Sequence, residues 1–106
     1  MEELKRIIET FGDSAQKVVA IEEMSELIKE ICKDMRGKTN RDGMIEEIAD
    51  VQIMLWQLRA MYHIDSSELE AVIRYKIKRT LQRIDNDPSL VKNDMQTYTT
   101  GESIAK

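Results

Sequence analysis

Two pairs of acidic residues, each pair three positions apart, are the part of this sequence best suited to chemistry. Glu23 and Glu26 form the first pair, and Glu47 and Asp50 form the second. Residues three apart on an α-helix share a face and lie about 4.5 Å apart along its axis. Four carboxylates that converge on a small volume raise one another's pKa values unless a cation neutralises them. A chain with one histidine and one cysteine offers mainly oxygen ligands, which suit Mg²⁺ or Mn²⁺.

Glu47 is placed within an apolar stripe and not at its edge. At about 100° per residue, Val51, Met54 and Leu58 point close to the direction of Glu47 on a helix expected over 42–63. A buried carboxylate is costly unless it takes up a proton or finds a partner, and a cation is the obvious partner. Spacing alone is equally compatible with a solvated acidic surface, and the inward aim of Glu47 favours the metal site. Four other acids are expected on the solvated face or around the metal ligands: Glu22, Glu30, Asp34 and Glu46.

A row of basic residues forms a second candidate constellation. Lys76, Arg79 and Arg83 recur at spacings of three and four, which places them on one face of a helix expected over 68–85. They are interpreted either as a solvated face with ion pairs or as a clamp for phosphate groups, which arginine grips with two hydrogen bonds. Further candidates for phosphate binding are Lys29, Lys33, Lys38 and Arg41.

Hydrophobic periodicity predicts four helices that must position these residues. Their expected ranges are 2–10, 14–36, 42–63 and 68–85. Asp13 with Gln16, and Ser67 with Glu70, match the capping-box pattern. Gly37 is expected to end the second helix, and Thr39 or Asn40 to cap the third.

The helix pattern predicts an all-α fold, an antiparallel four-helix bundle. The apolar residues expected inside it are Ala20, Ile21, Met24, Leu27, Ile28, Ile31 and Met35, then Met44, Ile48, Val51, Met54, Leu55, Leu58 and Met61, then Val72, Ile73, Ile77, Leu81 and Ile84. The helix over 42–63 is apolar nearly all round, which a single thin bundle cannot cover. We therefore expect dimerisation to complete the fold. Residues 1–86 are expected to form one domain, followed by a polar tail over 87–106.

Composition narrows the possible functions. The chain has 106 residues and a net charge of −4, which argues against a general nucleic-acid binder. The sequence has no apolar run long enough for a membrane span, and its start lacks the features of a signal peptide, so a cytoplasmic location is expected. A glycine-rich phosphate loop and a G-x-S-x-G nucleophile motif are both absent from the sequence. The remaining chemistry is hydrolysis by metal-activated water.

At the acidic pairs the sequence resembles the MazG-like group of all-α nucleoside triphosphate pyrophosphohydrolases, especially small phage-type members. The family's mark is E-x-x-E, a spacer, then E-x-x-D, which reads here Ile-Glu-Glu-Met-Ser-Glu-Leu at 21–27 and Ile-Glu-Glu-Ile-Ala-Asp-Val at 45–51. The likeness extends to Phe-Gly-Asp-Ser-Ala-Gln at 11–16 and to the run from Tyr75 to Ile84, and covers about residues 5–85.

The resemblance implies an Mg²⁺ site made by Glu23, Glu26, Glu47 and Asp50. It implies hydrolysis of a nucleoside triphosphate, ribo or deoxy, to the monophosphate and pyrophosphate, by a homodimer or a dimer of dimers. Either Glu26 or Glu47 would orient the attacking water. Two alternatives stay open: an enzyme like phosphoribosyl-ATP pyrophosphohydrolase, and a non-catalytic helical interaction module.

Overall fold

The computed structural model describes residues 2–90, and within that range all regular structure is helical. Four α-helices are present, α1 (Glu2–Phe11), α2 (Asp13–Met35), α3 (Arg41–Met61) and α4 (Ser66–Asn86), followed by a short 3₁₀ helix, η1 (Pro88–Leu90). The all-α prediction is confirmed, with helix bounds within two residues of those expected. Of the predicted tail over 87–106, the part after residue 90 lies outside the described residues.

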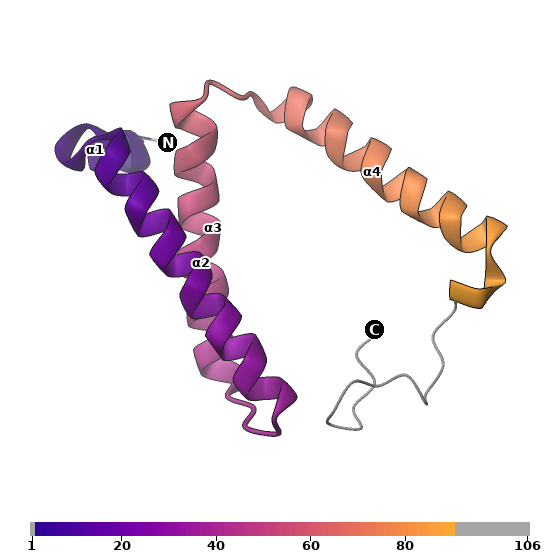
Figure 1. Ribbon diagram of the computed structural model, residues 1–106. Helices are drawn as coiled ribbons and strands as arrows, with labels where there is room; N and C mark the ends of the chain where they lie inside the picture. Colours follow the sequence, from indigo (N-terminus) through magenta and orange to yellow (C-terminus); the bar gives the residue numbers. More distant parts are fainter. Residues whose placement is uncertain (1, 91–106) are drawn as a thin grey trace. The chain divides into compact units, whose positions relative to one another are not determined.

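Contacts along the chain group it into two units, Met1–His63 and Ile64–Lys106. In the first unit, α2 and α3 lie side by side, and α1 packs against both (Figure 1). The five-residue connection between α2 and α3 makes the two helices antiparallel neighbours. In the second unit, α4 is followed by η1, which contacts it.

The turn between α2 and α3 is closed by the residues that the sequence indicated. Gly37 follows the last residues of α2 with a φ of 84°, a conformation that glycine adopts without a steric penalty. The amide of Lys38 donates to the carbonyl of Lys33 at 3.0 Å. Asn40 caps α3 by accepting a hydrogen bond from the amide of Gly43 at 3.0 Å. This turn fixes the start of α3 relative to the end of α2.

The two predicted capping boxes are wrong. Asp13 is the first residue of α2, and the cap position belongs to Gly12, which makes no side-chain capping bond. At α4 the cap is Asp65, whose Oδ1 accepts from the amide of Glu68 and from the hydroxyl of Ser67, both at 2.8 Å. Asp65 accepts from the amide of the third helical residue, which is the usual capping bond, so the helix begins at Ser66, before Ser67.

The interface between α2 and α3 is formed by residues at alternating spacings of three and four. On α2 they are Gln16, Ala20, Glu23, Leu27 and Glu30, and on α3 they are Gly43, Glu47, Asp50, Met54 and Gln57; all are buried or half-buried. Glu30 lies against Gly43, and Glu23 lies near Asp50. Continued along the two helices, this antiparallel register places Ala20 opposite Met54 and Gln16 opposite Gln57. Six of these ten residues are acids or amides, while half-buried apolar residues such as Met24, Met44 and Val51 lie on the same two helices.

Most of the apolar residues expected inside lie at the surface of the single chain. Ile21 and Ile28 on α2 are 68% and 60% exposed, and Ile48 and Leu55 on α3 are also exposed. In α4 no described residue is buried, and Val72, Ile73, Ile77, Leu81 and Ile84 are all exposed. The buried apolar residues of the described chain are Leu4, Ala20 and Met54. The α2–α3 interface shares Ala20, Leu27 and Met54 with the predicted apolar stripes, but it is rotated from the centre of each stripe toward the acids.

Candidate metal centre

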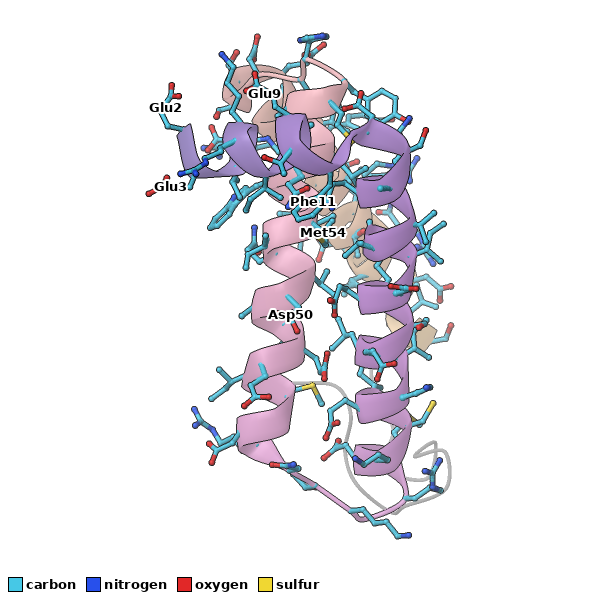
Figure 2. The ribbon with its side chains drawn as sticks, turned by 90° about the vertical axis from the view of Figure 1, so that its left-hand side faces the viewer. Glu2, Glu3, Glu9, Phe11, Asp50 and Met54 are labelled. Carbon is cyan, nitrogen blue, oxygen red and sulfur yellow. The ribbon has the colours of Figure 1, made fainter. Side chains whose placement is uncertain are left out.

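Three carboxylates from two helices meet in the middle of the α2–α3 interface. One oxygen each from Glu23, Glu47 and Asp50 lies within 4.8 Å of the others, and all three residues are half-buried. Asp50 and Met54 lie on the side of α3 that faces α2 (Figure 2). The first pair of the sequence motif thus supplies one member of the cluster, and the second pair supplies both.

Helix geometry explains why these side chains converge. Glu47 and Asp50 are three residues apart, so their directions differ by about 60° around α3. Glu23 occupies the position of α2 that faces Asp50 in the antiparallel register. Ala20 and Met54, one turn away, are each only 3% exposed, and this tight apolar layer holds the two backbones close at the acidic layer.

The electrostatics of the cluster oppose three simultaneous negative charges. Burial raises the pKa of Glu47 above its usual value of 4.5, and the charges of Asp50, Glu26 and Glu30 raise this pKa further. Burial also raises the pKa of Glu23, as do the nearby charges of Asp50, Glu47 and Glu26. A carboxylate group with a raised pKa carries its charge at a cost to the fold. Neutralisation by a cation would remove that cost.

The donor set fits a small divalent cation. The Oε1 atom of Glu47 is buried and has no hydrogen-bond partner. This oxygen could therefore bind a cation without losing a contact to another protein group. Oxygens that bind one Mg²⁺ ion lie about 3.0 Å apart when they are adjacent and about 4.2 Å apart when they are opposite. The three carboxylate oxygens, which lie within 4.8 Å of one another, would therefore have to move closer together to bind one ion. Three protein oxygens would leave further coordination positions for water or phosphate oxygens.

Glu26, predicted as a fourth ligand, lies outside this group of three. Its side chain is 49% exposed and pairs with Lys29 at 3.4 Å. The direction of Glu26 is rotated by about 60° from that of Glu23 around α2, which places it on the flank of the interface. Its charge still raises the pKa values of Glu23 and Glu47, so it lies close enough to influence the cluster.

The predicted phosphate-binding bases occupy two helices. On α2, Lys29 pairs with Glu26, and Lys33 lies 3.5 Å from Glu30. On α4, Lys76, Arg79 and Arg83 are exposed, and the guanidinium of Arg79 stacks over the ring of Tyr75 at 5.7 Å from its centroid. The two lysines of α2 therefore already have acidic partners, while the α4 bases present a charged surface to solvent.

Glu30 is a site residue that the periodicity of apolar residues did not single out. It was expected on the solvated face or around the ligands, and it is 8% exposed, with Oε2 buried and without a hydrogen-bond partner. A glycine in the first turn of α3 was the available signal. A Cβ atom on Gly43 would lie 3.2 Å from Glu30 Oε2 and 2.8 Å from Asn40 Nδ2, so the absence of a side chain at Gly43 lets Glu30 approach.

Comparison of the chain with protein-family models, with curated proteins and with solved structures gave no match in any of the three cases. None of the helices in the described range 2–90 is long and apolar enough to cross a membrane.

Replacement of Glu47 by glutamine tests the electrostatic cost of the cluster. The folded chain binds the Glu47 proton more tightly than the unfolded chain, because the pKa is raised on folding. Above about pH 4.5, the wild type should therefore lose stability relative to E47Q as the pH rises, while at lower pH the difference should stay constant. Urea unfolding of both proteins in a chelator, at several pH values, measures this difference, and Mg²⁺ should reduce it at neutral pH. A stability difference that does not vary with pH contradicts the description of the cluster.

Proposed function

We propose that this protein is an Mg²⁺-dependent nucleoside triphosphate pyrophosphohydrolase. The observation that carries the proposal is the convergence of Glu23, Glu47 and Asp50 between two antiparallel helices. These are three of the four acids that the resemblance to the MazG-like group implies as metal ligands. Mn²⁺ would bind the same oxygen ligands.

A divalent cation held by these carboxylates would neutralise charge on the phosphate oxygens and lower the pKa of a bound water. Glu47 is proposed to orient the attacking water and to accept its proton, through the carboxylate oxygen that does not bind the cation. Glu26 is the alternative, since its half-exposed carboxylate is available to solvent. The water oxygen bonds to a phosphorus atom, the anhydride bond between the α- and β-phosphates breaks, and the products are the nucleoside monophosphate and pyrophosphate.

Binding of a triphosphate also needs positive charge. Lys76, Arg79 and Arg83 are proposed to hold the phosphate oxygens, because arginine donates two parallel hydrogen bonds to such groups. Lys29, with a 69% exposed side chain, and Lys33 would assist by exchanging their carboxylate partners for phosphate. The pyrophosphate leaving group would be stabilised by the same cations.

The proposed enzyme is a homodimer or a dimer of dimers. Exposed large apolar residues recur on three helices, among them Val18, Ile21 and Ile28 on α2, Ile45 and Ile48 on α3, and Ile73 and Ile77 on α4. Exposure of contiguous apolar surface is unfavourable in water and marks association surfaces. A second copy of the chain, which carries the same stripes, is the proposed partner. The family resemblance implies the same assembly.

A panel of ribo- and deoxyribonucleoside triphosphates, assayed with Mg²⁺ for pyrophosphate release, tests the proposed activity. The variant E47Q should lose turnover and keep its helical fold, since glutamine preserves the size of the side chain without its charge. The exposed acid Glu22, on α2, provides the matched control E22Q, which should remain active. Near-normal pyrophosphate release by E47Q would rule out Glu47 as a metal ligand. Activity on phosphoribosyl-ATP alone would favour the related biosynthetic reaction.

The role of the α4 bases is tested by R79A and R83A. Loss of one charge-assisted hydrogen bond to phosphate is worth roughly 1.5–3 kcal/mol, so kcat/KM should fall about 10- to 100-fold. Mg²⁺ binding to the free protein should change little, because neither residue is a candidate ligand. If α4 were only a solvated face, the kinetic constants would match those of the wild type, because exposed ion pairs contribute roughly 0–1 kcal/mol.

Light scattering at micromolar concentration tests the proposed assembly. We expect the mass of a dimer or a larger assembly, because association with a second copy would bury the exposed apolar stripes. Replacement of Ile28, which is 60% exposed, by lysine should shift the mass toward the monomer, whereas replacement of the exposed Lys29 by glutamine should leave it unchanged. A fully active wild-type monomer at assay concentrations would refute the assembly.

A further inference from the structure

We propose that Gly43 is a positioning residue of the candidate metal centre: because it has no side chain, α2 approaches α3 closely enough to keep the three carboxylates of the cluster together. The proposal deepens the proposed metal-dependent function and rests on it. Gly43 itself would touch neither the ion nor the substrate. It would act through the packing of Glu30, on α2, against the first turn of α3.

Two polar side chains close on the position of Gly43. A Cβ atom there would lie 3.2 Å from Oε2 of Glu30 and 2.8 Å from Nδ2 of Asn40, both shorter than an ordinary van der Waals contact of 3.4–4 Å. A methyl group at this position would therefore displace its neighbours. Gly43 lies within α3, and its φ is not positive. The backbone conformation thus does not require glycine, and the close contacts are what favour it.

Both neighbouring side chains are held by other contacts. Glu30 is 8% exposed, and its Oε1 lies 3.5 Å from the ammonium nitrogen of Lys33. Asn40 caps α3, and its Oδ1 accepts a hydrogen bond from the amide of Gly43 at 3.0 Å. An added methyl group would disturb the cap, break the ion pair or push the two helices apart. We expect separation of the helices, because repulsion among the carboxylates of the cluster already favours it.

The close approach at Gly43 lies one helical turn from the cluster. Glu47 follows Gly43 by four residues, which is about 6 Å along the axis of α3 and on the same face. On the other side of the cluster, Ala20 and Met54 form the tight apolar layer. The cluster is thus bracketed by a small residue of α2 on one side and a small residue of α3 on the other. If the helices separated at Gly43, the carboxylate oxygens, now within 4.8 Å of one another, would move apart when ion binding needs them closer.

Manganese binding to the full chain of the variant G43A tests this role. Its affinity for Mn²⁺, measured by electron paramagnetic resonance of the free ion, should fall about tenfold, as is typical when a group that positions metal ligands is changed. The metal-free variant should stay helical, because alanine favours a helix more than glycine does. The control A49S adds one atom at an exposed position of the same helix and should bind Mn²⁺ as the wild type does. If Gly43 were an ordinary helix residue, G43A would bind Mn²⁺ as tightly as the wild type.

Second substitutions identify the contact through which Gly43 acts. The variant E30D keeps the charge of Glu30 and shortens its side chain by one methylene, which makes room for the new methyl group. The double variant E30D/G43A should therefore bind Mn²⁺ more tightly than G43A, a non-additive result that is expected only of residues in contact. The substitution N40S keeps a capping hydroxyl and removes the amide group nearest the methyl group. Added to G43A, it should recover less affinity than E30D does.

The outcomes separate this proposal from the proposed function. Wild-type Mn²⁺ affinity in G43A overturns the positioning role and leaves the metal site in place. Recovery by N40S and not by E30D also overturns it, because the methyl group would then act on the helix cap alone. Absence of Mn²⁺ binding by the wild type at millimolar concentration overturns the proposed function, and this proposal with it. If G43A does not fold, recovery of the fold and of Mn²⁺ binding in E30D/G43A supports the proposal, and an unfolded double variant overturns it.

Discussion

Repulsion among carboxylates inside a helix–helix interface is the constraint on which the rest of this structure depends. Glu23, Glu30, Glu47 and Asp50 all occupy positions that a stable helix pair would normally fill with apolar side chains. The apolar layer of Ala20 and Met54 and the capped turn at Asn40 hold the acids together from the two sides. The helices are thus held close at the point where their own charges oppose contact, which is the arrangement that binding of a cation stabilises.

The polar interface also accounts for where the apolar residues lie. Because the positions between α2 and α3 are taken by acids and by the amides of Gln16 and Gln57, the isoleucines of both helices fall on other faces and are exposed in one chain. An ordinary helix pair would bury those isoleucines and expose the acids. Burial of a carboxylate without a counter-charge is several times more costly than exposure of one apolar side chain, and the proposed function would offset both costs with other molecules. A cation would do so at the acids, and a second copy at the apolar stripes.

The sequence predicted the elements of this fold better than their orientation. Periodicity located all four helices, and the chemistry of Gly37 and Asn40 located the turn, because these signals are local. The rotation of each helix is not local, since it depends on which face meets the neighbour. The apolar stripe predicted on α3 has Glu47 at its centre and Asp50 at its margin. The face of α3 that contacts α2 includes both residues and continues to Gln57. Because of this rotation, Glu26 lies on the flank of the α2–α3 interface and Glu30 is buried. The small size of Gly43 was the feature of the sequence that could have indicated the burial of Glu30.

Helix α4 shows how assembly and substrate binding are linked in the proposed function. At about 100° per residue, Ile73, Ile77, Leu81 and Ile84 fall within roughly 80° of arc and form one apolar stripe. Lys76 and Arg83 fall about 100° and 120° from the centre of that stripe on the same side, and Arg79 falls about 160° from it, on the opposite face. A surface that covers the isoleucines would therefore leave these bases open to solvent, where a phosphate group can reach them. In such a position the bases keep their hydration until a ligand arrives, and the cost of a fully buried cation is avoided. In the proposed function, the order of residues on α4 would thus provide an association surface on one side and solvent-facing bases on the other.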